Sequence, residues 1–208
     1  TSGMTQQGDK ISDSPPQRSF LITIWMAYMC AGFGYVVSAT FIVDMVESVA
    51  ALQGNGELAF LIIGIAAAPA CMLWDIVARR TGVINALLWT YVLNSVGIIL
   101  PALSDNLLIV LAGSLLFGIS FIGIVSLVLT MAGRFYPTRP AVLMGKLTIA
   151  YGIAQIIGPA ISGYIAEYTG NYHAALYMAT GFMIIGTILV FSLKNTDYKA
   201  LYTGQPGS

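Results

Sequence analysis

The stretch WDIVARRTG, residues 74–82, ends a long apolar run by placing one acid and two adjacent arginines close together. Such charges are scarce, because only 9% of the 208 residues are charged and 57% are hydrophobic, whereas roughly 25% of residues are charged in an average soluble domain. The composition therefore indicates a protein that resides in lipid. Its few charges mark the places where membrane spans end.

Six gaps between charges are long and apolar enough to cross a bilayer as helices, which takes about 20 residues. The runs are continuous rather than alternating, which favours helices over barrel strands, since a helix satisfies its own backbone hydrogen bonds in lipid. The sequence therefore predicts an all-α integral membrane domain over residues 19–194, between a flexible lead-in (1–18) and a tail (195–208). The gaps run from Arg18 to Asp44, Glu57 to Asp75, Arg80 to Asp105, Asp105 to Arg134, Lys146 to Glu167 and Glu167 to Lys194.

Lysine and arginine occur only before the first span and after the second, fourth and sixth. The other three connections carry acids instead, namely Asp44, Glu47, Glu57, Asp105 and Glu167. Because basic residues stay on the cytoplasmic side of short loops, a multi-pass protein with both termini in the cytoplasm is expected. The zero net charge hides this segregation and offers no basic surface for nucleic acid.

The motifs of several other membrane-protein classes are missing from the sequence. It has one histidine and neither H-E-x-x-H nor G-x-S-x-G, which disfavours a protease or metalloenzyme. It also lacks a Walker motif and N-P-A repeats. We therefore expect no catalytic residue, no bound metal and no cofactor, and we interpret Cys30 and Cys71 as small apolar residues of the spans rather than a disulfide.

An internal repeat relates positions 88 residues apart. ARRTGVINALL (78–88) aligns with AEYTGNYHAAL (166–176) at five of eleven positions, while Arg79 and Arg80 become Glu167 and Tyr168. This exchange of charge is expected if one joint faces the cytoplasm and the other faces outside, although five matches can also arise by chance in so narrow a composition. Two inverted three-helix repeats are one way of building half a transporter.

The opening stretch, extended to CMLWDIVARR (71–80), resembles the motif G-x-L-x-D-R-x-G-R-[RK] of the major facilitator superfamily. Four of its residues match, Leu73, Asp75, Arg79 and Arg80, and three depart from the motif, Cys71, Ile76 and Ala78. YGIAQIIGPAISGYIAEYTGNYHAAL (151–176) is similar to the family's G-P-x-x-G helix and the helix after it. GFGYVVSATF (32–41) and GRFYP (133–137) are most similar to the YbfB/YjiJ-type bacterial members.

This resemblance implies the carboxyl-terminal six helices of a twelve-helix secondary transporter in a bacterial inner (plasma) membrane. It would move a small-molecule solute by alternating access, with the lipid bilayer and an N-terminal six-helix half as partners and residues 1–18 as the linker between halves. The competing interpretation is a stand-alone six-helix channel or structural subunit, in which a second copy supplies the other half.

The resemblance also implies that Asp75, Arg79 and Arg80 form a conformational latch at the cytoplasmic helix ends. Asp75 and Arg79 are spaced i, i+4 with the acid nearer the amino end, the better orientation for a helical pair. The alternative is that these charges merely follow the inside-positive rule.

Candidates for the solute path are polar residues inside spans, which usually face protein or a cavity. Thr148, Tyr151, Gln155 and Ser162 share one helical face, and Gln155 lies roughly 13 to 18 Å from either end of its span. Helix-to-helix bonding explains such a residue equally well. The resemblance places the first and fourth spans beside the same path, which adds a set for which plain aromatic packing remains an equal alternative, Tyr28, Tyr35, Phe117, Ser120 and Phe121.

Two further expectations concern helix shape and packing. Pro69 and Pro159 are expected to bend the second and fifth spans. Asn94 in the third span is expected to make a structural hydrogen bond.

Overall fold

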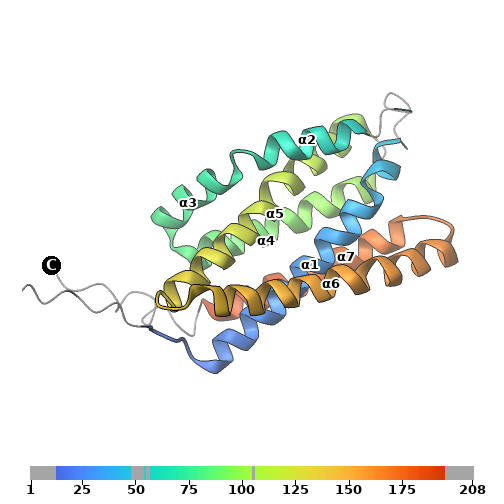
Figure 1. Ribbon diagram of the computed structural model, residues 1–208. Helices are drawn as coiled ribbons and strands as arrows, with labels where there is room; N and C mark the ends of the chain where they lie inside the picture. Colours follow the sequence, from blue (N-terminus) through green and yellow to red (C-terminus); the bar gives the residue numbers. More distant parts are fainter. Residues whose placement is uncertain (1–12, 48–53, 55–56, 105, 195–208) are drawn as a thin grey trace, which may run out of the picture.

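The computed structural model describes residues 13–47, 54, 57–104 and 106–194, and every regular element in these ranges is an α-helix (Figure 1). This confirms the predicted all-α fold. The seven helices are α1 (Arg18–Glu47), α2 (Glu57–Ala67), α3 (Ala70–Thr81), α4 (Val83–Leu103), α5 (Leu107–Phe135), α6 (Pro140–Thr169) and α7 (His173–Leu193).

Within the described residues, five of these helices are by themselves long and apolar enough to span a membrane, and the bent pair of α2 and α3 passes the same test when the two are taken together as one span. The axes of α2 and α3 differ by 42° across the break. Proline at position 69 explains the break, because it lacks an N–H donor and its ring clashes with the preceding turn. The bend expected at Pro69 is thus confirmed, whereas α6 continues through Pro159 as one helix.

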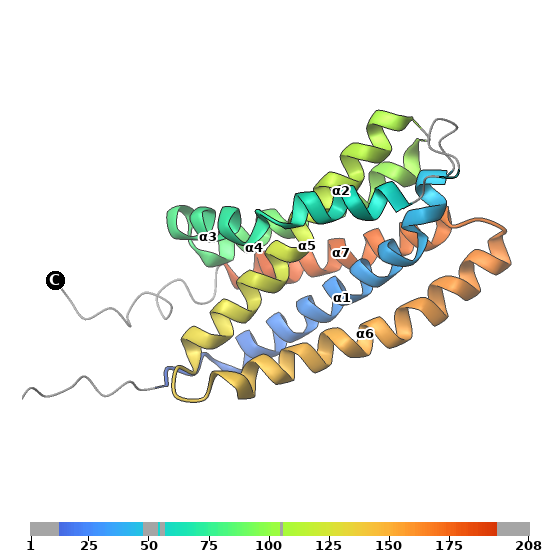
Figure 2. The same cartoon turned by 45° about the horizontal axis from the view of Figure 1, so that its top comes forward.

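The helices pack as two groups of three spans. In one group α5 lies against α4 and the α2–α3 pair, and in the other α1 lies against α6 and α7 (Figures 1 and 2). Contact between α4 and α7 joins the groups. Each group therefore combines the first span of one predicted repeat with the second and third spans of the other.

The two joints aligned by the repeat share two local features, although ψ differs between their glycines, 150° at Gly82 and 8° at Gly170. Gly82 and Gly170 both have positive φ, +88° and +72°, a conformation that favours glycine because it has no Cβ. The hydroxyl of the threonine before each glycine donates to the carbonyl four residues earlier, Thr81 to Val77 at 2.9 Å and Thr169 to Ile165 at 2.8 Å. The joints lie at opposite ends of the bundle (Figure 1), as inverted repeats require.

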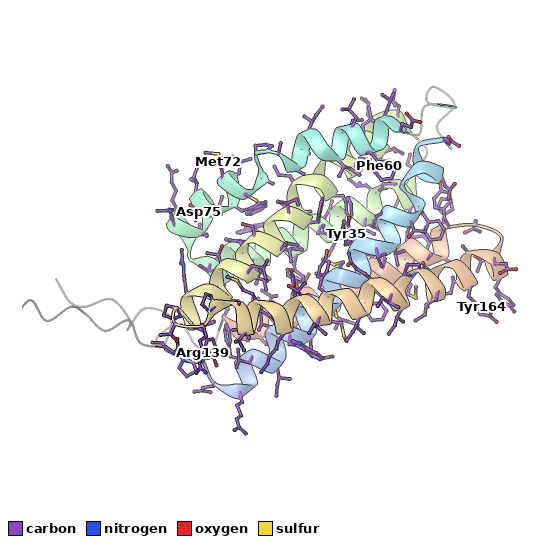
Figure 3. The ribbon with its side chains drawn as sticks, viewed as in Figure 1. Tyr35, Phe60, Met72, Asp75, Arg139 and Tyr164 are labelled. Carbon is purple, nitrogen blue, oxygen red and sulfur yellow. The ribbon has the colours of Figure 1, made fainter. Side chains whose placement is uncertain are left out.

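Charges separate along the bundle axis. The basic residues of the described chain lie at or near one end, which we call the basic end: Arg18, Arg79, Arg80, Arg134, Arg139, Lys146 and Lys194. Figure 3 shows Asp75 and Arg139 at this end, and Tyr164 near the opposite one. The basic end is the end that the inside-positive rule would assign to the cytoplasm.

Candidate functional site

An aromatic cluster joins α1, α5 and α6 about midway along the bundle. Tyr35 is at its centre, with its ring centroid 5.0 Å from that of Phe121 and 6.1 Å from those of Phe117 and Tyr151. Tyr28 lies 4.7 Å from Tyr151, and Phe117 lies 5.4 Å from Phe121. Figure 3 shows Tyr35 between α1 and the neighbouring helices. The structure thus brings together five of the nine residues named above as candidates for the solute path.

Helical spacing and one glycine build this aromatic cluster. Tyr28 and Tyr35 are two turns apart on α1, and Gly32 lies between them on the same face. A Cβ added at Gly32 would lie 2.7 Å from the carbonyl oxygen of Tyr151. The absence of that Cβ lets the backbones of α1 and α6 touch, which brings the tyrosines of both helices into ring contact.

Burial differs across the aromatic cluster. Tyr28 and Phe117 are buried, whereas Tyr35, Phe121 and Tyr151 are half-buried. Within the described residues, no hydrogen bond links the three tyrosine hydroxyls to another group. Among the described residues, the tyrosine hydroxyls that are both enclosed and unpaired are those of Tyr91 and Tyr172, so the hydroxyls of the cluster are open to water or to a bound molecule.

Gln155 follows Tyr151 by one turn of α6 and is half-buried. Its amide makes no hydrogen bond in the part of the chain that the structure describes. The alternative explanation, a hydrogen bond to a neighbouring helix, therefore has no partner residue there. Thr148 is exposed on the same helix, and its hydroxyl donates to the Met144 carbonyl at 2.9 Å. Ser162 is fully buried and donates to the Pro159 carbonyl at 3.4 Å.

Ser120 lies apart from the aromatic cluster, although Phe117 and Phe121 flank it in sequence. Its hydroxyl accepts a 2.9 Å hydrogen bond from the Asn94 amide, and both residues are buried between α4 and α5. The structural hydrogen bond expected of Asn94 is therefore present, and Ser120 is its partner.

Tyr91 is a buried polar residue that the sequence did not single out. Its side chain is fully buried and its hydroxyl has no partner among the described residues. A Cβ added at Gly186 of α7 would lie 2.7 Å from the Tyr91 ring. Nothing in the third span distinguishes this tyrosine from the aromatic residues common in membrane helices, so only the packing reveals it.

The predicted latch residues occupy the last turns of α3. Arg79 Nε lies 2.8 Å from Asp75 Oδ2, with the two side chains 73% and 43% exposed. An exposed i, i+4 pair of this kind contributes about 0.3 to 0.5 kcal/mol, so it adds little to the stability of the fold. Arg80 is exposed and forms no ion pair within the described ranges.

A second contact at the basic end ties the segment before α1 to the joint between α5 and α6. The Thr138 hydroxyl and backbone N–H donate to the Asp13 carboxylate at 2.7 and 3.0 Å, and the Ser14 N–H donates to the Phe135 carbonyl at 2.9 Å. The two hydrogen bonds from Thr138, together with Arg139 at 4.0 Å, lower the pKa of Asp13 below its ordinary value of 3.8. No local pattern of residues predicts this contact.

Large apolar side chains stand out along the outer surfaces of α2, α3 and α6 (Figure 3). On α6 the exposed fraction reaches 79% at Ile156. A Cβ added at Gly64 of α2 or at Gly152 of α6 would meet no atom within 4 Å. These surfaces have both the apolar character and the small residues that allow another helix to approach closely.

Comparison with known proteins identifies several similar transporters. The family described as "Uncharacterised MFS-type transporter YbfB" matches residues 6–191. Monocarboxylate transporter 6 of Mus musculus is 24% identical over 99 residues, which are 47% of this chain and 21% of that protein.

Solved transporter structures share the fold at low sequence identity. The POT family transporter PepTSo has a TM-score of 0.73 at 16% identity, over 86% of this chain and 38% of its own. A peptide transporter POT in complex with alafosfalin has a TM-score of 0.74 at 18% identity, over 87% of this chain and 40% of its own. The chain therefore spans less than half the length of the proteins that it matches.

Proposed function

The chain belongs to the family of MFS-type transporters described by YbfB, and from this membership we propose that it is the carboxyl-terminal six-helix half of a secondary transporter. In this proposal a small polar solute binds near the middle of the bilayer and crosses it by alternating access. The match covers 38% and 40% of the length of two solved transporters, which supports the interpretation that this chain is one half of a longer protein.

The aromatic cluster is the observation that carries this proposal. Its three tyrosine hydroxyls and the nearby Gln155 amide are donors and acceptors without partners in the described chain, and the phenylalanine rings beside them form an apolar wall. A solute that supplies the missing hydrogen bonds offsets the cost of leaving these groups unpaired. The predicted path residues Thr148, Tyr28, Tyr35, Phe117, Phe121, Tyr151 and Gln155 belong to this proposed site.

Ser120 belongs to the same proposal only indirectly. Its hydroxyl is held by Asn94 within the α4–α5 contact, so we assign it a positioning role for Phe117 and Phe121 on either side. A solute contact at Ser120 would require that hydrogen bond to break.

The exposed apolar surfaces of α2 and α3 support the presence of a second set of six helices. In the proposal an N-terminal half covers them, and a second copy of this chain is the competing occupant. Reading the coding sequence upstream of Thr1 separates the two. Six more apolar spans would support the transporter half, and a start codon near Met4 would support the stand-alone subunit.

The latch belongs to the conformational step of this mechanism. The Asp75–Arg79 pair is exposed at the basic end, where it contributes little stability and can exchange partners as the helix ends move. In the complete protein, Asp75→Asn or Arg79→Ala should slow transport more than it weakens solute binding. A parallel fall of rate and affinity would refute the latch.

The proposal is tested by uptake into vesicles that contain the full-length protein, screened against a broad panel of metabolites. Once a solute is found, Gln155→Leu keeps the bulk and removes the amide. Losing a hydrogen bond of about 1 kcal/mol should weaken solute affinity about fivefold. Gln17→Leu makes the same exchange at an exposed site before α1 and should leave affinity unchanged. Unchanged affinity in Gln155→Leu, with a lowered thermal midpoint, would remove Gln155 from the site.

A further inference from the structure

A cavity of about 500 Å³ lies outside the aromatic cluster, in the groove between the amino-terminal halves of α1 and α6. Its lining is aliphatic apart from three side chains, Tyr136 in the α5–α6 joint, Trp25 of α1 and Lys146 of α6, and aliphatic residues lie on both sides of Lys146 along α6. On α6 the groove contains Ile149, two residues before Tyr151. Positions two apart on a helix point in nearly opposite directions, so Ile149 points away from the aromatic cluster, whereas Leu147, one turn before Tyr151, lines the groove on the side of the cluster.

Lys146 is the one charged residue that lines this groove. Its side chain is exposed and forms no ion pair with any described residue. The Trp25 indole N–H donates to the Lys146 backbone carbonyl at 3.2 Å, which fixes the indole at the same level. Tryptophan, tyrosine and lysine together are typical of the boundary between lipid headgroups and hydrocarbon. We therefore take the level of Trp25 and Lys146 in the groove as the level of the lipid headgroups.

A separate cavity of about 150 Å³ lies farther along α1 and α6, toward the middle of the bundle, where Phe182 of α7 also lines it. Its walls are apolar and include Met29, Phe33, Ile153 and Ile157. Ile157 is eleven residues beyond Lys146 on α6, which is about 16 Å along the helix. The hydrocarbon of one leaflet is about 15 Å thick, half of the roughly 30 Å core. The stretch of α6 from Lys146 to Ile157 therefore has the length of one leaflet.

We propose that this α1–α6 groove binds an anionic phospholipid from the leaflet at the basic end. Its phosphate pairs with the Lys146 ammonium group, and one acyl chain lies past Trp25 along the aliphatic walls toward Ile157. An anionic headgroup is selected over a zwitterionic one because the groove offers a cation and no described acid. Basic pockets between membrane helices bind acidic lipid headgroups by the same chemistry.

Fluorescence quenching by brominated acyl chains tests the proposal on the full-length protein in vesicles. Phosphatidylglycerol and phosphatidylcholine that carry the same brominated chains are compared at equal mole fraction. The Trp25 contribution is the difference between the wild type and Trp25→Phe. One lysine beside the headgroup should give the anionic lipid about a fivefold preference, equivalent to about 1 kcal/mol.

Charge variants at Lys146 then identify the source of that preference. Lys146→Gln should abolish it, and Lys146→Arg should retain it. Lys194→Gln removes an exposed lysine at the same end, outside the groove, and should retain the preference as well. Equal quenching by the two lipids in the wild type, or an unchanged preference in Lys146→Gln, would overturn the proposal. Both readouts are independent of transport.

Discussion

Gly32 of α1 lies against α6 in the same way that Gly118 of α5 lies against α2. A Cβ added at Gly32 would come within 2.7 Å of the Tyr151 carbonyl oxygen, and one added at Gly118 within 2.7 Å of the Ile63 carbonyl oxygen. Ile63 and Tyr151 are 88 positions apart, the spacing of the repeat. Each group of helices therefore contains one glycine-to-carbonyl contact, in which the carbonyl residues keep the repeat spacing and the glycines are 86 positions apart.

The side chains at the two contacts differ. At Tyr151 the contact carries the aromatic cluster with its unpaired hydroxyls, whereas at Ile63 it carries a buried aliphatic side chain. The helix also differs, since α6 is continuous and α2–α3 is broken at Pro69. The scaffold is thus common to both groups, and the chemistry proposed for solute binding belongs to one of them.

The largest expected effect comes from filling the two contacts themselves. Gly32→Ala and Gly118→Ala each push a methyl group against a backbone carbonyl, which cannot move aside as a flexible side chain can. Overpacking of this kind typically costs about 1 to 3 kcal/mol, so both variants should unfold at clearly lower temperature in detergent. Gly181→Ala on α7, where an added Cβ meets nothing within 4 Å, is the matched control. A normal thermal midpoint in one variant alone would show that the two contacts are not equivalent.

The next effect separates the chemistry of the two contacts. Tyr151→Phe removes one hydroxyl and keeps the ring, so solute affinity should fall about fivefold, for a hydrogen bond of about 1 kcal/mol, at an unchanged thermal midpoint. Ile63→Val at the equivalent position should lower the thermal midpoint slightly and leave affinity unchanged. Equilibrium binding and thermal unfolding are measured on the same preparations. Equal losses of affinity would place the solute between both groups.

A smaller effect is expected where α5 and α1, the helices that carry Gly118 and Gly32, contact α4 and α7. The Asn94 amide donates a hydrogen bond to Ser120 between α4 and α5. Between α1 and α7, by contrast, the ring centroids of Phe33 and Phe182 are 4.3 Å apart. Hydrogen bonds between membrane helices contribute about 0.6 kcal/mol on average. Asn94→Leu should therefore lower the thermal midpoint less than Gly118→Ala does. A larger loss would mean that this hydrogen bond organises the α4–α5 contact.

The smallest effect concerns the link from the segment before α1 to the α5–α6 joint. Because hydrogen bonds and Arg139 lower the pKa of Asp13 in the folded chain, its contribution is present above the ordinary value of 3.8 and is lost as pH falls through the lowered pKa. Thr138→Val should therefore change the thermal midpoint little at pH 7 and make it less sensitive to acid below about pH 4. The pH dependence of unfolding, compared with the wild type, checks this. An unchanged acid response would show that Asp13 gains nothing from Thr138.

The sequence predicts the number and order of the spans because charges interrupt the apolar runs, but the helices extend past these charges: α3 continues six residues beyond Asp75, and α6 begins six residues before Lys146. Pro69 likewise predicts the broken helix, since its missing N–H acts locally. The orientation of each helix about its own axis is harder to predict, because spans that are apolar on every side have no polar face to orient them. Ser120 shows the consequence: the sequence predicts it for the solute path with Phe117 and Phe121, whereas its hydroxyl faces Asn94 of α4. The Asp13 link and the lipid groove depend on contacts between distant segments and left no local pattern.

A contact made through glycine and a carbonyl oxygen constrains only the glycine. The residue that contributes the carbonyl takes part through its backbone, so its side chain is free to change without loss of the contact. After a duplication, one copy of such a contact can keep an aliphatic side chain while the other acquires tyrosine, and neither change requires the helices to be repacked. The backbone contact thus separates the inheritance of the fold from the evolution of specificity, which gives this architecture room to diversify.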